Sequence, residues 1–72
     1  MRTSLLRQIG KRVRERREAL GMSQEELAQK SGCHRTYIGM VERAEKSVGV
    51  ERLVQISRAL RTTISELLRG LG

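Results

Sequence analysis

One predicted helix near the middle of the chain has a solvent-facing side. The groups on that side could hydrogen-bond to the edges of nucleic-acid bases. Ile38 and Val41 are three residues apart, so they share one face of a helix and are expected to turn inward. Four residues of the same helix then point largely outward: Arg35, Thr36, Gly39 and Met40. An arginine supplies a forked donor suited to guanine, and a threonine offers a hydroxyl and a methyl group that can meet thymine. The spacing therefore favours a base-reading face.

Gly39 is an unusual member of this face, because glycine inside a helix costs about 0.5–1 kcal/mol relative to alanine. One explanation is that the helix closely approaches another surface, such as the wall of a DNA groove. The alternative is that Gly39 is a neutral weakness at an exposed position. The sequence leaves both explanations open.

Five helices are predicted to position this face, because apolar residues recur at helical spacing in a chain of 72 residues without proline. The first covers residues 4–20. The second runs from 23 to about 31, and the third begins at 33 or 34 and ends near 43. The last two are marked by their apolar residues, which are Val50, Leu53, Ile56, Ala59 and Leu60 in the fourth and Ile64, Leu67 and Leu68 in the fifth.

The residues at the helix ends support these boundaries. Glycine ends the first helix at Gly21 and separates the second from the third at Gly32, where it permits a left-handed turn at low cost. Gly49 is a plausible cap for the fourth helix. Two segments have the spacing of a capping box, namely Ser23 with Glu26 and Thr63 with Glu66.

The second and third helices are too short to be stable alone, so they are expected to share a core with the first and the fourth. Ala28 is small enough to let the third helix approach closely. The residues expected to close the core beneath the pair are Leu27, Cys33, Ile38 and Val41. The prediction is an all-α, compact five-helix bundle that forms one domain over residues 1–72, with a helix-turn-helix motif at about 23–42.

The charge indicates the kind of partner. Fifteen lysines and arginines against eight acidic residues give a net charge of +7, which attracts a polyanion. An anionic membrane would also attract this charge, but the chain has no Trp or Phe, and Tyr37 is its only aromatic residue. The balance favours nucleic acid over a membrane.

The composition also excludes several classes of protein. One cysteine cannot close a disulfide within the chain, and no cysteine–histidine cluster has zinc-ligand spacing. No segment resembles a membrane span or a signal peptide. No carboxylate pair, nucleophile–base set or phosphate-binding loop stands out. We therefore expect a cytoplasmic protein that is not an enzyme and that needs no metal or cofactor.

The motif resembles the helix-turn-helix proteins of the Cro and phage-repressor type over roughly residues 8–68. Seven residues stand at the marker positions of that family: Gln24, Leu27, Ala28, Gly32, Ile38, Val41 and Glu42. The stretches GMSQEELA, HRTYIG and ER are similar to the small controller proteins of restriction–modification systems. The resemblance implies a lambda-repressor-like DNA-binding domain.

The resemblance also implies roles for individual residues. The base-reading set would be Arg35, Thr36, Tyr37, Gly39 and Met40. The phosphate-binding set would be Gln24, Arg43 and Lys46. His34 departs from the family, in which Ser, Thr or Asp commonly caps the third helix, and is itself expected to cap that helix or to join the phosphate-binding set. Arg17 and Glu42 match a pair that forms a structural salt bridge in relatives. Many relatives have glycine where Ala44 stands and proline where Val48 stands, so the resemblance does not fix the loop that follows the third helix.

Proteins of this type usually bind inverted repeats as two-fold dimers, with half-sites about one helical turn apart. The apolar residues near the end of the chain either cap the core or form such an interface, and we favour an interface of Ile64, Leu68 and Leu71.

The leading hypothesis is a transcription regulator that binds double-stranded DNA sequence-specifically, as a homodimer on an inverted repeat. It would be a repressor or controller of its own or a neighbouring operon, such as a restriction–modification operon. A regulator that activates would also need a surface that touches RNA polymerase. The alternative is an antitoxin or a bridging coactivator whose main role is protein–protein interaction.

Overall fold

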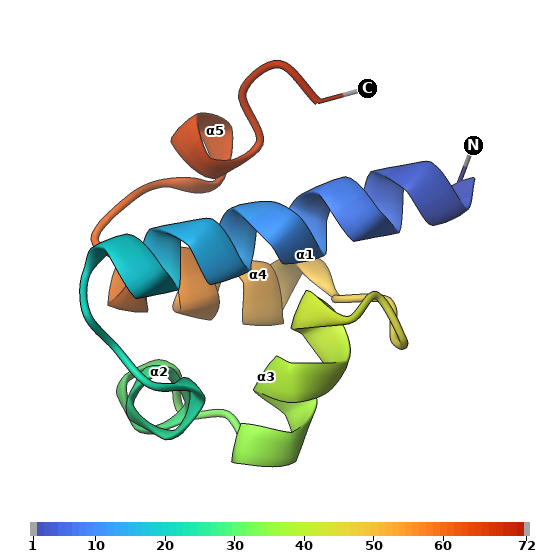
Figure 1. Cartoon of the computed structure of the whole chain (residues 1–72). Coiled ribbons are helices and arrows are strands. Elements are labelled where there is room, and N and C mark those ends of the chain that lie inside the picture. Colours follow the sequence, from blue (N-terminus) through green and yellow to red (C-terminus); the bar gives the residue numbers. More distant parts are fainter. Residues whose placement is uncertain (1, 72) are drawn as a thin grey trace.

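Helix α1 runs along the molecule between the short helix α5 and the α2–α3 pair, with α4 behind it in the view of Figure 1. The computed structural model describes residues 2–71 and the side chains of residues 5–71; Met1 and Gly72, which the predicted domain includes, lie outside the described residues. The helices are α1 (Arg2–Ala19), α2 (Gln24–Ser31), α3 (Arg35–Glu42), α4 (Val50–Ala59) and α5 (Ile64–Leu67). The predicted all-α architecture of five helices is confirmed over the described residues.

The helix boundaries differ from the predicted ones by a few residues. Helix α1 begins at Arg2, two residues before the predicted start, and ends at Ala19. Helix α3 begins at Arg35 because His34 is its N-cap, and it ends at Glu42 because Arg43 is its C-cap. Leu60, predicted within the fourth helix, is the C-cap of α4, while Leu68, predicted within the fifth, is the C-cap of α5.

Four helices end in the same way, with a residue in the left-handed region after the last turn. These residues are Gly21 (φ 70°), Gly32 (φ 72°), Ala44 (φ 59°) and Arg61 (φ 58°). At the end of α3, the Ala44 N–H donates to the Val41 carbonyl at 3.1 Å and the Glu45 N–H to the Met40 carbonyl at 2.8 Å. This is the Schellman pattern, which satisfies carbonyls that the helix itself leaves without partners.

The helix starts follow the capping predictions in part. Ser23 and Glu26 exchange both bonds of a capping box at 3.0 Å each. Thr63 accepts the Glu66 N–H at 3.1 Å, but the Glu66 carboxylate pairs with Arg69. The capping box predicted at α5 is therefore confirmed for the Thr63 bond alone, because the Glu66 side chain pairs with Arg69 instead of returning to the Thr63 backbone.

The core lies where α1, α2, α3 and α4 meet, and α5 covers one end of it. Its buried apolar residues are Val13, Met22, Leu27, Ala28, Ile38, Val41, Leu53, Ile56, Leu60 and Leu67. Cys33, predicted inside the core, is half-buried at its edge. Val50, predicted on the apolar face of the fourth helix, is 74% exposed because it stands in the first turn, beyond the core.

Two arginines of α1 hold the C-terminal ends of the last two helices. Arg16 donates to the carbonyls of Leu60 at 2.9 Å and Arg61 at 3.2 Å, just beyond α4. Arg12 donates to the carbonyl of Leu67, the last residue of α5, at 2.9 Å. Cations are favoured at these sites because helix C-termini carry partial negative charge. Part of the basic charge of α1 is therefore structural.

Candidate nucleic-acid interface

The outward face of α3 is the candidate interface, and the structure divides its predicted residues into three groups. Arg35 and Thr36 are exposed, and they follow directly after the N-cap. Tyr37 and Met40 are half-buried at the edges of the face. Gly39, predicted to point outward, is buried.

Gly39 is buried because the side chain of Arg43 folds back along α3 and covers it. A Cβ atom added at Gly39 would lie 2.9 Å from Nη1 of Arg43, so the guanidinium would have to shift to admit a side chain there. The guanidinium that lies over Gly39 belongs to the same helix, one turn along, so the predicted close approach to another surface such as a groove wall stays a prediction. The alternative placed Gly39 at an exposed position, whereas here it is buried.

The Arg43 guanidinium is held on its other side by Glu45. Nε and Nη2 of Arg43 donate to the two carboxylate oxygens of Glu45 at 3.0 and 3.2 Å. These hydrogen bonds raise the pKa of Arg43 and lower the pKa of Glu45 from their ordinary values. Both side chains stay more than half exposed, so the pair adds little to stability and mainly fixes the direction of the guanidinium.

Helix α3 is fixed against α1 at a point where the two backbones nearly touch. A Cβ atom added at Gly10 of α1 would lie 2.5 Å from the Val41 carbonyl oxygen and 2.8 Å from that of Glu42. Only glycine fits this crossing, because backbone atoms cannot move aside as a flexible side chain can. Gly10 therefore sets how closely α3 sits against the rest of the domain.

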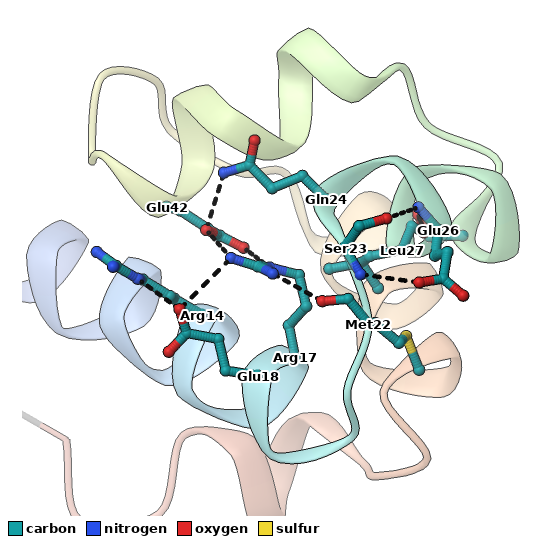
Figure 2. A network of polar contacts seen from close by, with 10 residues as sticks. Arg14, Arg17, Glu18, Met22, Ser23, Gln24, Glu26, Leu27 and Glu42 are labelled. Carbon is teal, nitrogen blue, oxygen red and sulfur yellow. Dashed lines mark hydrogen bonds and ion pairs between the residues drawn. The ribbon is translucent and has the colours of Figure 1, made fainter.

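A polar network ties α1, α2 and α3 together beneath the interface (Figure 2). Nε and Nη2 of Arg17 donate to the Glu42 carboxylate at 2.7 and 3.1 Å, and Nη1 donates to the Met22 carbonyl at 2.7 Å. Gln24 reaches the same carboxylate from α2 at 3.1 Å. The hydrogen bond to Glu42 is the main cause that raises the pKa of Arg17.

This network is largely buried, and its role is to position α3. The side chains of Arg17 and Glu42, the pair expected to be structural, are only 11% and 4% exposed. Removing one partner of such a buried pair typically costs about 3–5 kcal/mol, because the other charge is left uncompensated. Gln24 was predicted to contact phosphate, and only one hydrogen of its amide is used by Glu42.

His34 and Lys46 lie at opposite ends of α3. Nδ1 of His34 accepts the Thr36 N–H at 3.2 Å, so this histidine caps the helix as predicted. With Nδ1 as acceptor, the other ring nitrogen, Nε2, carries the proton and can donate outward. Lys46 is exposed in the loop after α3.

The apolar residues near the chain end occupy intermediate positions. Ile64 and Leu68 pack against the core but remain half-buried, as does Leu71. A hollow of ≈ 350 Å³ lies between α4 and α5, with Val54 and Ile64 in its lining. This region therefore both caps the core and leaves apolar surface uncovered.

Several contributors to the interface were not identified from the sequence. Gly10 and the brace formed by Glu45 were missed, although a glycine in the interior of an arginine-rich helix was a visible signal for the first. Within the described part of the chain, no three side chains are placed to hold a metal ion. No helix there is long and apolar enough to cross a membrane.

Comparison with known proteins agrees with this geometry. Residues 13–67 match the model of a helix-turn-helix family. The control protein C.SmaI of Serratia marcescens is 44% identical over 64 residues, covering 89% of this chain and 76% of that protein. The restriction–modification controller protein C.AhdI of Aeromonas hydrophila has a crystal structure with a TM-score of 0.84 and 42% identity, covering 86% of this chain and 94% of that one. The DNA-binding domain of the P22 c2 repressor has a TM-score of 0.81 and 34% identity, covering 86% and 82% of the two chains.

Proposed function

The chain belongs to the helix-turn-helix family, and we propose that it is a DNA-binding transcription regulator that reads an inverted-repeat operator as a homodimer. The observation that carries the proposal is the division of α3 into two faces. Ile38 and Val41 anchor the helix in the core, while Arg35 and Thr36 stand exposed beside each other. A rigid helix that presents such groups fits the major groove, where each base pair displays a distinct set of donors and acceptors.

Arg35 is proposed as the main base-reading residue. It is exposed at the first position of α3, the end of a recognition helix that meets base edges. Its guanidinium can donate two parallel bonds to O6 and N7 of a guanine. Thr36, Tyr37 and Met40 would complete the contact with neighbouring base pairs. Gly39 serves this surface indirectly, through the arginine that covers it.

Phosphate contacts on either side of the groove would fix the orientation of the helix. Gln24 opens α2, where its second amide hydrogen and the free backbone N–H groups of the first turn suit an anion. His34 can donate from Nε2, and Lys46 carries a free charge in the following loop. These contacts carry no sequence information but supply much of the affinity. Arg43, the fourth residue predicted for this role, is paired with Glu45 and lies over Gly39.

The second copy is proposed to bind at the apolar surface left by Ile64, Leu68 and Leu71, beside the hollow between α4 and α5. The dimer would hold its two recognition helices about one turn of DNA apart. Repression then needs only occlusion of a promoter, and the relatives that control restriction–modification systems suggest an operon of that kind. Activation would need a further contact with RNA polymerase. A regulator of this kind acts in the cytoplasm.

The test is selection from a random duplex library at moderate salt. We expect recovery of an inverted repeat with half-sites about one helical turn apart. On that operator, Arg35→Ala should cost about 1–3 kcal/mol and relax the preference at one base pair in each half-site. Lys46→Ala should weaken binding to all DNA sequences by a similar factor.

The matched control is Arg14→Ala, which removes the same charge from an exposed position of α1. It should leave the recovered sequence unchanged. Retention of DNA without enrichment of any sequence would contradict the proposal, and would favour a protein whose main partner is another protein.

A further inference from the structure

Arg43 is placed on the reading face of α3 and not at its edge. Arg35, Gly39 and Arg43 are four residues apart, so they form one stripe along the helix. The middle position has no side chain, and the Arg43 guanidinium lies over it with Nη1 at 2.9 Å from the place of a Cβ atom. The charged end of Arg43 is thereby brought back toward Arg35.

The contact with Glu45 is unfavourable for a phosphate ligand. A carboxylate 3.0 Å from Nε of Arg43 repels an approaching phosphate and cancels much of the attraction of the guanidinium. A flexible, unpaired lysine serves a phosphate contact better, and Lys46 stands next in the chain. A carboxylate that fixes the direction of a guanidinium is useful where that direction matters, as in a hydrogen bond to a base edge.

A guanidinium braced in this way still has donors for a base. Glu45 engages Nε and one hydrogen of Nη2, which leaves the Nη1 hydrogens and the second hydrogen of Nη2. Two N–H groups from that edge are spaced to bond O6 and N7 of one guanine. The carboxylate also disfavours binding in a register that would place a phosphate beside it.

We propose that Arg43 is a second guanine-reading residue, seated over Gly39 and oriented by Glu45. The inference rests on the proposed function, since it assigns a further specificity-determining residue to the same DNA-binding surface.

The experiment measures binding of the full chain to the selected operator and to every single base-pair variant of it. Arg43→Ala should abolish preference for one G·C pair in each half-site, distinct from the pair affected by Arg35→Ala. The loss at that pair should be roughly 5- to 150-fold, the range for a bidentate contact between arginine and guanine. Arg14→Ala, an exposed arginine of α1 also paired with a carboxylate, is the control and should change no preference.

Two further variants separate orientation from charge. Glu45→Gln should reduce preference at the same G·C pair while binding to random duplex becomes tighter, because a negative charge is lost. Gly39→Ala should also reduce that preference, because the added methyl group would displace the guanidinium from its position over residue 39. Circular dichroism and thermal unfolding of each variant would check that α3 remains folded.

A uniform loss of affinity in Arg43→Ala across all operator variants would overturn the inference and return Arg43 to the phosphate-binding set. An Arg43→Ala variant that recovers the same sequence as the wild type would overturn it as well, with the proposed function intact. If the wild type enriches no sequence at all, the proposed function fails and this inference fails with it.

Discussion

At the scale of single residues, Tyr37 shows how the position of a side chain in the fold sets the chemistry of the proposed base-reading face. Tyr37 is a half-buried residue of α3. The burial of its phenol is the main cause that raises its pKa above the ordinary value near 10. The charge of Arg52 and a hydrogen bond from the Gly49 backbone act in the opposite direction but do not reverse the shift. The phenol is therefore a neutral group at physiological pH and keeps its hydrogen for donation.

The titration of Tyr37 can be followed directly, because it is the only tyrosine and the chain has no tryptophan. Ultraviolet absorbance of the phenolate should give a pKa above 10 in the folded protein. The raised pKa favours the neutral form in the fold, so its contribution to stability is complete below pH 10 and is lost as pH rises through the folded pKa. The same titration in denaturant should return to the ordinary value. A folded pKa at or below the unfolded one would contradict the burial seen here.

The sequence predicts some residues of the candidate interface better than others, for a physical reason. The exposure of Arg35 and Thr36 follows from the inward direction of Ile38, because helical spacing fixes which residues share a face. The burial of Gly39 does not follow in this way. It depends on the side-chain conformation of Arg43, which periodicity does not encode.

At the scale of elements, the left-handed residues that end four helices are not equally suited to their conformation. Two are glycines, for which φ near +70° costs little, but Ala44 and Arg61 carry side chains. A non-glycine residue pays roughly 1–2 kcal/mol for this conformation. The end of α3 is therefore strained at Ala44.

Ala44→Gly should raise the free energy of unfolding by about 0.5–1 kcal/mol. The relief of the left-handed strain is partly offset by the greater freedom of glycine in the unfolded chain. Urea denaturation monitored by circular dichroism would measure the change. The reciprocal control is Gly21→Ala, which has φ 70° and no neighbouring atom within 4 Å, and it should destabilise by a similar amount. A destabilising effect of Ala44→Gly would show that the Ala44 side chain makes a contact worth more than the strain.

The elements themselves were largely predictable, because caps and glycines mark their ends. Ser23, Gly21 and Gly32 define the ends of α1 and α2 from local sequence alone. The contacts between elements were not predictable. The bonds of Arg12 and Arg16 to the ends of α5 and α4 join residues more than forty positions apart, and no local pattern indicates them.

At the scale of the whole molecule, one copy has extents of 31 × 22 × 21 Å and presents a single helix, α3, to the proposed operator. Helix α3 has eight residues and is about 12 Å long, so one copy reads about four base pairs. Such a short sequence is too common to select one site in a genome. Two linked copies multiply their affinities without new contacts.

Leu71→Asp should dissociate the dimer, because it places a charge on the proposed apolar interface. Sedimentation velocity should then give a monomer at concentrations where the wild type is dimeric, and operator affinity should fall by a factor of about 10² or more. The control is Leu5→Asp, a change at an exposed leucine of α1 that should leave the dimer intact. If the Leu71→Asp protein stays dimeric, the interface does not include Leu71. The exposed Val50 would then be the next apolar residue to test.

The backbone contact at Gly10 has a consequence for how such regulators diverge. Because α3 rests on α1 through carbonyl oxygens, it cannot slide or tilt without disturbing the core. In the proposed dimer, a change in the distance between half-sites would then arise where the two copies meet, which we propose is near α5. A change in the preferred bases can arise at Arg35 and Thr36, whose side chains lie outside the core. Half-site spacing and base preference would thus be separate properties of this domain. A duplicated gene could change either one while retaining the other.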